Sequence, residues 1–346
     1  MVQSRDYKSK MHIVYASDDN FAEIMGVSIL SLFQNNKDVS EIIIYILDSG
    51  INDENKQRVE MVFRTYNREL PVWIPAININ DVLGIEVRQD RGSISQFARL
   101  FISRVLPEDL DRVLYLDCDI IVNKSISELW NMDFKGKTIA ALLDPFSILY
   151  RKNLGLEKND VLFNSGVMLI NFQKWKLNNV EDRLLSLINK YNGLIPQGDQ
   201  GALGAILSKE TLLIHPKFNA ITLFYDFTYE DMMIYRKSPY YYSKSEIENA
   251  RDNPVIVHFT TSFLSRRAWN EGSKHPYAEK WIEYKNMSPW KDEKLRIYKV
   301  NQGWKEIYLR LYKKLPINVS VRLSGLLQAY GRPLLIKAKY NIHWKE

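Results

Sequence analysis

The sequence predicts an α/β fold in which helices cover a mostly parallel β-sheet, followed by a separate helical tail. Over the first 260 residues, short apolar segments rich in isoleucine and valine alternate with segments of helical periodicity. These short segments are apolar throughout, as expected for strands buried on both faces of a parallel sheet. After residue 290 the chain becomes basic and helical. We therefore predict a polar extension over residues 1–10, one domain over residues 11–290 and a tail over residues 291–346.

The composition excludes several classes of protein. A hydrophobic content of 46% in 346 residues is enough for a large core. No segment reaches the ~18 consecutive apolar residues that cross a bilayer. The first ten residues lack the apolar segment of a secretory signal, and the single cysteine, Cys118, excludes an intrachain disulfide framework. We therefore expect a cytoplasmic protein.

The predicted elements follow one another in an order typical of α/β units. Asp18, Asp19 and Asn20 follow the first strand and supply N-caps for the first helix. Ligands of such folds bind beyond the carboxyl ends of the strands, where Asp18 lies. Strands are predicted over residues 11–16, 41–47, 71–77, 112–122, 138–143 and 166–171, and helices to about residue 34 and over residues 53–66 and 95–106.

Two carboxylates, Asp117 and Asp119, give the strongest chemical signal in the chain. They stand one residue apart at the end of the apolar run Val-Leu-Tyr-Leu. Because strand side chains alternate, both carboxylates are expected on one side where the strand ends. Adjacent anions are unfavourable unless a cation lies between them, and a hard divalent metal that holds phosphates suits oxygen ligands. A second Asp-x-Asp, Asp109 and Asp111, is expected in an exposed turn.

An Asp-x-Asp motif after a strand fits two classes of enzyme. One is a haloacid-dehalogenase-type phosphatase, which carries the motif on an early strand and an acidic pair near the end of the chain. The other is a nucleotide-sugar transferase. Here the motif follows several α/β units, and Asp199 is followed by Gln200 and Gly201 without a second carboxylate. The order of the motifs favours the transferase.

Six short motifs lie in order along the chain, over residues 11–21, 95–100, 115–119, 163–171, 198–200 and 257–260. The first reads Met-His-Ile-Val-Tyr-Ala-Ser-Asp-Asp-Asn-Phe, and the fourth reads Phe-Asn-Ser-Gly-Val-Met-Leu-Ile-Asn. These motifs resemble those of glycosyltransferase family 8, which includes glycogenin and bacterial lipo-oligosaccharide α-galactosyltransferases. Their order and spacing agree with the family over about residues 11–290. The resemblance implies a single Rossmann-like nucleotide-sugar-binding domain of the GT-A type.

The resemblance also implies a set of site residues. Asp117, Asp119 and His258 match the ligands of Mn²⁺, with Mg²⁺ as the alternative ion. Asp144 matches a position near the acceptor. Asp199, Gln200 and Arg99 match catalytic positions at the donor sugar. The implied donor-binding residues are Ala16, Ser17, Asp18, Asn20, Phe21, Ile94, Arg99, Asp117, Cys118, Asp119, Asn164, Ser165, Gly166, Asp199, Gln200, Thr261, Arg266 and Arg267.

Elementary chemistry agrees with these assignments, and each has a structural alternative. Asp18 is able to accept a hydrogen bond from the edge of a uracil base, and its alternative role is only to cap a helix. Phe21 is able to stack on the base. Two carboxylates and an imidazole suit Mn²⁺, although an isolated histidine such as His258 is more often structural. A guanidinium at Arg99 suits a phosphate or carboxylate, and Gly166 has a simpler explanation as a tight turn.

The segment after His258 departs from the family pattern. The family usually continues with a glycine and then a lysine near Pro-Trp. Here Thr261 replaces the glycine, the loop is about three residues longer, and Arg266 or Arg267 replaces the lysine. Either arginine is able to hold a diphosphate oxygen.

The predicted function is a retaining, Mn²⁺-dependent transfer of glucose or galactose from a UDP-sugar to a glycan or lipid-linked glycan. A sugar-nucleotide-binding scaffold without turnover is the alternative from another class. Six tyrosines between residues 225 and 242 predict either a sugar platform or a partly exposed packing segment.

The tail predicts a peripheral position on the inner face of an anionic membrane. Residues 291–346 contain 13 Lys and Arg but 4 Asp and Glu. An aromatic and aliphatic stripe at helical spacing accompanies this charge, and the alternative is that the stripe packs on the domain. The basic residues match no nucleic-acid motif, so no nucleic-acid partner is expected. The stripe comprises Trp304, Ile307, Tyr308, Leu311, Tyr312 and Leu315.

Overall fold

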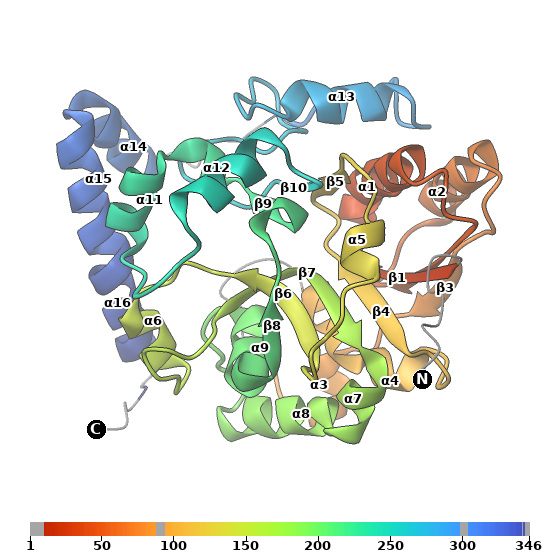
Figure 1. The fold of residues 1–346 in the computed structure, drawn as a ribbon, viewed down its shortest axis with the longest axis horizontal. Coiled ribbons are helices and arrows are strands. Elements are labelled where there is room, and N and C mark those ends of the chain that lie inside the picture. The colour runs from red at the N-terminus through yellow and green to blue at the C-terminus, as the bar shows by residue number, and fades with distance from the viewer. Residues whose placement is uncertain (1–9, 88–93, 298–303, 341, 343–346) are drawn as a thin grey trace.

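The central sheet has seven strands in the order β3-β2-β1-β4-β7-β6-β8 (Figure 1). The computed structural model describes residues 10–87, 94–297, 304–340 and 342. Six strands share one direction, and only β7 runs antiparallel to its neighbours β4 and β6. The mostly parallel sheet is therefore confirmed. Its strands are β1(Lys10–Ser17), β2(Glu41–Asp48), β3(Val72–Pro75), β4(Arg112–Leu116), β6(Ile139–Leu143), β7(Phe163–Asn171) and β8(Thr211–Leu213).

Helices cover both faces of this sheet, as the continuous apolar strands predict. Successive residues of β1 enter different cores, because strand side chains alternate: Ile13 joins one cluster and Val14 the other. One face carries α1(Ala22–Asn35), α2(Asp53–Thr65) and α13(Ala278–Asn286), above the sheet in Figure 1. The other carries α3(Ile79–Leu83), η3(Ile94–Phe101), α4(Ile102–Val105), α7(Phe172–Leu177), α8(Val180–Lys190) and α9(Gly198–Leu207).

A second, three-stranded sheet stands at the carboxyl ends of the main strands. Its central strand β10 runs antiparallel to β5 and parallel to β9. The strands are β5(Ile120–Val122), β9(Ala220–Ile221) and β10(Ile256–His258). The remaining elements of the domain are η2(Asp19–Phe21), α5(Ser127–Trp130), α6(Ile148–Asn153), η4(Ser208–Glu210), η5(Pro216–Phe218), α10(Leu223–Asp226), α11(Tyr229–Arg236) and α12(Lys244–Asp252).

The predicted single strand over residues 112–122 is wrong in one respect that matters for the site. It divides into β4 and β5, which belong to different sheets. The backbone between them is held on both sides, because Asp117 N donates to Gly166 O (2.8 Å) and Phe259 N donates to Asp119 O (2.9 Å). The Asp-x-Asp pair therefore lies in the crossing between two sheets.

The predicted helix over residues 95–106 also differs, because most of it is the 3₁₀-helix η3. A 3₁₀-helix has three residues per turn, so residues three apart lie on one side. Gln96 and Arg99 have this spacing, and Arg99 Nε donates to Gln96 O (3.1 Å). The tighter winding thus fixes the base of the Arg99 side chain.

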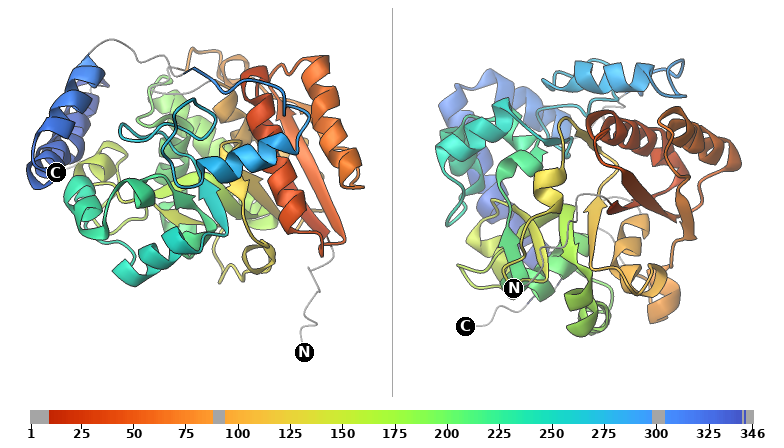
Figure 2. Two further views of the ribbon diagram at one scale, coloured as in Figure 1. Left: turned by 90° about the horizontal axis from the view of Figure 1, so that it is seen from above. Right: turned by 45° about the vertical axis from the view of Figure 1, so that its right-hand side comes forward.

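The tail forms a column of helices beside α6 and α11 (Figures 1 and 2). Close backbone approach and polar bonds hold it there. A Cβ at Gly325 would lie 2.5 Å from Ile234 O, so only glycine permits this contact. Ser147 Oγ donates to Ala329 O (2.7 Å). The column consists of α14(Trp304–Lys314), α15(Ile317–Leu326), the π-turn η6(Leu327–Gly331) and α16(Arg332–Lys339).

The predicted stripe of α14 divides between the domain and the surface. Tyr308 and Tyr312 pack on Phe263, with ring centroids 5.4 and 5.3 Å away. Ile307 and Leu311 remain exposed, at 62% and 55% of their surface. The side chain of Trp304 lies outside the described part of the structure. In the described segments, no helix has both the length and the apolar character to span a bilayer.

Candidate active site

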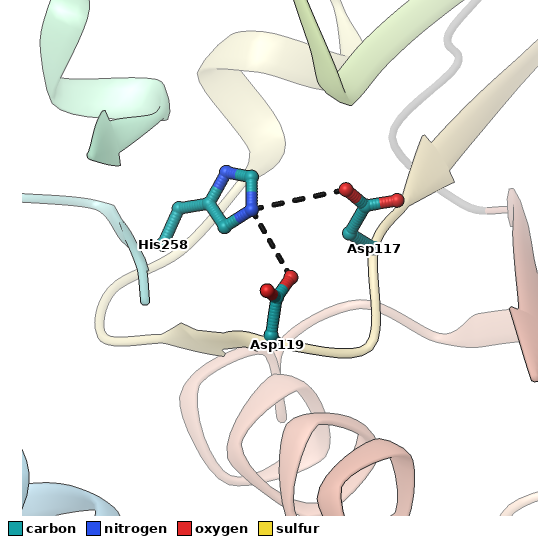
Figure 3. Close-up of side chains that lie close together, drawn as sticks. All are labelled: Asp117, Asp119 and His258. Atoms are coloured by element: carbon teal, nitrogen blue, oxygen red, sulfur yellow. Dashed lines mark ion pairs between the residues drawn. The ribbon is translucent and has the colours of Figure 1, made fainter. Parts of the chain in front are cut away.

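Three potential metal ligands meet where the two sheets adjoin (Figure 3). Asp117 and Asp119 lie in the β4–β5 crossing, and His258 ends β10. One ligand atom from each residue lies within 4.8 Å of the others. His258 Nε2 is 3.1 Å from Asp119 Oδ1 and 3.8 Å from Asp117 Oδ2. Two carboxylates and one imidazole facing a common point fit a divalent cation such as Mn²⁺.

The imidazole of His258 is held from behind by an asparagine that the sequence alone did not indicate. Asn219 is fully buried and its Oδ1 lies 2.9 Å from His258 Nδ1. Its Nδ2 donates to Asn164 Oδ1 (2.9 Å), so its oxygen is the atom that faces the ring. His258 Nδ1 then carries a hydrogen and Nε2 faces the two carboxylates, so Nε2 is able to donate to Asp119 when it is protonated and to bind a metal ion through its lone pair when it is not. Such outer partners orient metal-binding histidines in general.

Gly166 is required by the close packing of the three potential metal ligands and not by a turn. It lies within β7 with an ordinary strand backbone. A Cβ at this position would lie 2.2 Å from His258 Cε1 and 2.7 Å from Asp117 Oδ2. Any side chain here would displace two of the three potential ligands, so the tight-turn explanation is wrong.

Arg99 connects the three potential metal ligands to the predicted sugar-binding residues. Its guanidinium is 2.9 Å from both Asp117 Oδ1 and Asp199 Oδ2, and it donates to Ser165 O (2.9 Å). It also lies 4.3 Å over the ring of Tyr115. Burial opposes its charge, but Asp117 and Asp199 outweigh burial and raise the pKa of Arg99. This buried cation therefore remains charged and fixes both carboxylates.

Asp199 keeps one oxygen without a hydrogen bond. The single hydrogen on Arg99 Nε is given to Gln96 O, so the nearby Asp199 Oδ2 accepts none within the described structure. Burial raises the pKa of Asp199 to about 6, against the opposing effect of Arg99. Oδ2 is therefore ion-paired with Arg99 but keeps the capacity to accept a hydrogen bond, which suits a ligand hydroxyl.

Gln200 bridges the donor side to the predicted acceptor position. Its Nε2 donates to Asp144 Oδ2 (3.3 Å), and its Oε1 is 3.5 Å from Ser165 N. Asp144 is 5% exposed, and burial raises its pKa. Its second oxygen has no hydrogen bond in the described structure. Asp144 and Gln200, predicted from separate motifs, are thus in direct contact.

The predicted uracil pocket lies at the end of β1. Asp18 precedes η2 but its side chain makes no cap bond, and its buried Oδ1 has no partner among the described atoms. Helix capping therefore does not explain Asp18. Phe21 meets Trp269 edge-to-face at 6.2 Å, and the Arg296 guanidinium lies 6.0 Å from the Phe21 ring. Arg296 also donates to the carbonyl of Asn20 (2.6 Å).

Two residues beside the predicted uracil pocket, Ser17 and Cys118, bond to backbone carbonyls. Ser17 is buried and donates to Asp18 O (3.0 Å), and the thiol of Cys118 contacts Ala16 O (3.2 Å). Burial raises the pKa of Cys118, so the thiol stays protonated. The side chain of Ile94 lies outside the described part of the structure.

The loop after β10 separates the two arginines that the sequence left as alternatives. Arg267 Nη2 is 3.3 Å from Asp119 Oδ2 and donates to Thr261 Oγ1 (2.7 Å). Arg266 instead donates to the carbonyl of Glu271 (2.8 Å). Burial would raise the pKa of Asp119, but His258 and Arg267 outweigh it and lower the pKa to about 2. Of these two arginines, Arg267 is the one whose guanidinium lies beside the potential metal ligands in the described structure.

A family model decides the identity of this arrangement. The model for glycosyl transferase family 8 matches residues 12–271, most of the chain. The chain belongs to glycosyltransferase family 8. The predicted hexosyltransferase is thereby confirmed, and the phosphatase alternative loses its support.

Several known proteins are similar along most of the chain. General stress protein A of Bacillus subtilis is 30% identical over 81% of this chain and 94% of its own length. The lipopolysaccharide 1,2-glucosyltransferase of Escherichia coli K12 is 25% identical over 83% of this chain and 80% of its own length. A solved structure of galactosyltransferase LgtC with donor and acceptor sugar analogues has a TM-score of 0.67 at 24% identity. It covers 86% of this chain and 99% of that chain, which confirms the GT-A fold.

The tyrosine-rich segment of this family 8 protein is mainly a packing segment. Tyr235 is buried against Phe227 (4.9 Å), and Tyr242 OH donates to Ile214 O (2.8 Å). Tyr241 differs, because its buried hydroxyl has no hydrogen bond within the described residues. Burial raises the pKa of Tyr241, and among the charged groups that affect this pKa Asp144 raises it and Arg236 lowers it. Packing thus accounts for Tyr235 and Tyr242, whereas a sugar platform formed by the partly exposed rings of this segment stays a prediction.

Arg236 and Tyr241 are candidate functional residues that sequence reasoning missed. Both interact electrostatically with Asp144, and Arg236 Nε is itself buried without a hydrogen bond in the described structure. The only signal in the sequence was the density of aromatic residues. A residue that ends one helix and a residue in the following loop share no motif that would connect them to Asp144.

Proposed function

We propose that this chain is a retaining, Mn²⁺-dependent transferase that moves glucose or galactose from a UDP-sugar to a cell-surface or lipid-linked glycan. One observation carries the proposal: a potential metal site adjoins, through Arg99, a buried Asp199 oxygen that lacks a hydrogen bond. A nucleotide diphosphate needs the first feature and a sugar hydroxyl needs the second. The two lie where one UDP-sugar would reach both.

Asp117, Asp119 and His258 would hold the metal ion. When bound, the ion supplies charge stabilisation for the leaving diphosphate. Arg267 is placed to add a second positive charge there, since it already faces Asp119. Phe21 would stack on uracil and Asp18 would bond its edge, since Phe21 N donates to Asp18 O (3.1 Å) in one turn, the ring of Phe21 is partly buried and Asp18 Oδ1 has no partner in the described structure.

Asp199 and Gln200 would orient the donor sugar, and Asp144 would orient the acceptor. With these groups, the anomeric configuration would be retained through front-face attack, in which the acceptor oxygen attacks from the side on which the phosphate leaves. Asp199 is paired with Arg99 and Gln200 presents an amide, so neither is a free nucleophile. The departing phosphate oxygen would then take the acceptor proton, and close positioning supplies much of the remaining acceleration.

The acceptor class follows from the relatives and the tail. The Escherichia coli relative is a lipopolysaccharide glucosyltransferase, and a lipid-linked acceptor calls for a position at the membrane. The outer side of the tail is rich in exposed leucines and carries the basic residues Arg322, Lys337 and Lys339. Apolar side chains beside basic ones suit the interface of an anionic bilayer at the inner face of the membrane. The exposed residues are Ile307, Leu311, Leu315, Ile317, Val319, Leu323, Leu326, Leu327, Tyr330, Leu334 and Leu335.

Two measurements test the proposal. UDP release is assayed with UDP-glucose, UDP-galactose and their N-acetyl forms, with Mn²⁺ and with EDTA. Transfer to a glycan, with the anomeric configuration read by NMR, is expected for one hexose donor and only with the metal. UDP binding by calorimetry without any release would instead establish a sugar-nucleotide-binding protein.

Membrane binding is tested separately by co-sedimentation with anionic vesicles at low and high salt. Sedimentation at low salt is expected. Leu326→Glu combined with Leu335→Glu should abolish it, whereas Leu177→Glu, at a 77% exposed site on α7, should not. Failure of the unmodified protein to sediment would remove the membrane from the proposal.

A further inference from the structure

The segment over residues 259–267 carries Arg267 but has no helix or strand of its own. It begins after His258 and ends beside Trp269, over whose ring the Arg267 guanidinium lies at 5.3 Å. We call this segment the arginine loop. A loop without a regular hydrogen-bond ladder is placed by its side-chain contacts, so the position of Arg267 depends on what anchors the loop.

The first anchor of the arginine loop is polar. Asp226 at the end of α10 accepts a hydrogen bond from Ser262 on one carboxylate oxygen and from Ser265 on the other. Ser262 Oγ also accepts from Leu264 N (3.1 Å), which tightens the turn between the two serines. One half-buried carboxylate thus holds the loop at two points, three residues apart.

The second anchor is aromatic and lies between the two serines. Phe263 packs on Phe227 and Tyr235 of the domain, with ring centroids 6.5 and 5.8 Å away. Its nearer partners belong to the tail, since Tyr308 and Tyr312 of α14 lie 5.4 and 5.3 Å away. Tyr312 is itself buried at 8% exposure. The tail therefore completes the cluster of aromatic rings that surrounds Phe263.

We propose that Phe263 and Asp226 are positioning residues for Arg267, and that α14 is thereby a structural part of the donor site. The inference rests on the proposed function, in which Arg267 meets the donor diphosphate. Phe263, Asp226 and α14 are not expected to touch substrate. Phe263 and Asp226 act by holding the loop that directs Arg267 towards Asp119.

A thermodynamic cycle tests the coupling. Phe263→Ala should weaken UDP binding in Mn²⁺, measured by calorimetry, about tenfold, and Arg267→Ala should weaken it at least as much. If Phe263 acts through Arg267, the double variant binds no more weakly than Arg267→Ala alone. Tyr312→Ala should reproduce the loss in part. Tyr191→Ala, which removes an exposed aromatic at the end of α8, should leave UDP affinity unchanged.

A second readout needs neither turnover nor ligand. Trypsin should cleave after Arg266 or Arg267 several-fold faster in Phe263→Ala than in the unmodified chain, with the sites identified by mass spectrometry. Phe263→Leu, which keeps apolar volume, should restore most of the protection. If Phe263→Ala fails to fold, Ser262→Ala with Ser265→Ala removes the polar anchor alone and enters the same cycle with Arg267→Ala.

The outcomes separate this inference from the proposed function. Additive losses of UDP affinity, or unchanged cleavage of the arginine loop, would overturn the positioning role even in an active transferase. Absence of UDP release from the unmodified protein would refute the transferase proposal, while faster loop cleavage in Phe263→Ala would still support the anchors.

Discussion

The two sides of the active site are held in different ways. On the strand side, Asp117, Arg99 and His258 come from buried elements, and each has partners that fix its orientation. On the loop side, Arg267 stands on a segment anchored by two serines and one phenylalanine. The strand side is therefore preorganised for its ligands, whereas the loop side depends on distant contacts that include the tail. Substitutions on the strand side should be the more damaging.

The largest effect is expected from Asp119→Ala, which removes one of the three potential metal ligands. Mn²⁺-dependent turnover should fall at least ~1,000-fold, while the circular dichroism spectrum stays unchanged, because the backbone carbonyl that holds Phe259 is retained. Asp109→Ala, in the exposed upstream Asp-x-Asp, should have no effect. Activity that survives both Asp119→Ala and EDTA would contradict the metal site.

Gly166→Ala should be the next most severe change. The added methyl would overlap His258 and Asp117, so we expect about a 100-fold loss of activity and a loss of roughly 1–3 kcal/mol in the free energy of unfolding. Chemical denaturation and turnover assays measure both. Gly331→Ala, where the nearest atom is 3.7 Å away, is the matched control and should be neutral. A fully active Gly166→Ala protein would show that the ligands have room to move.

Gln200→Ala should lower kcat far more than it weakens UDP binding. Its amide contacts Asp144 and lies near Ser165, away from the uracil pocket, so its interactions would develop mainly in the transition state. We expect a decrease in kcat of about 10- to 100-fold with UDP affinity within about twofold. Calorimetry that shows a large loss of UDP affinity with kcat intact would reverse this assignment.

The smallest expected effect is the pH dependence contributed by Asp199. Its pKa of about 6 lies above the unfolded value near ~4, so the folded protein binds this proton more tightly. Binding of this proton contributes on the order of 2 kcal/mol to the free energy of unfolding. This contribution is fully present below pH ~4 and is lost as the pH rises through ~6. Urea unfolding of metal-free protein at pH 4–7 should show this decline. Asp199→Asn should flatten it, and parallel curves for the two proteins would refute the raised pKa.

The strand side was largely predictable from the sequence because its residues belong to local motifs. Asp117 and Asp119 follow a visible apolar run, and Asp199 and Gln200 are adjacent in the chain. The predicted strand failed only where the chain leaves one sheet for the other, since periodicity does not show which sheet a strand joins. Asn219, whose role depends on meeting His258 across 39 residues, carried no local signal.

The loop side was less predictable because it depends on packing between distant segments. The helical spacing of the tail identified an amphipathic helix correctly, but spacing did not reveal which side of the stripe meets the domain. Tyr312 and Leu311 are neighbours in sequence, yet one is buried and the other exposed. The choice between Arg266 and Arg267 required knowledge of where Glu271 and Thr261 lie. The assigned domain boundary at residue 290 stays a prediction.

The burial of Cys118 makes the protein a convenient subject for chemical labelling. It is the only cysteine in the chain, and its protonated thiol is enclosed between Asp117 and Asp119, two of the potential metal ligands. A thiol reagent should therefore leave the folded protein unmodified, and the rate of labelling would report the opening of the site itself. A reporter dye attached through Leu335→Cys would mark the tail alone. One protein would then carry two independent probes. Cys118 would react only when the site opens, and the dye would report from the outer surface of the tail.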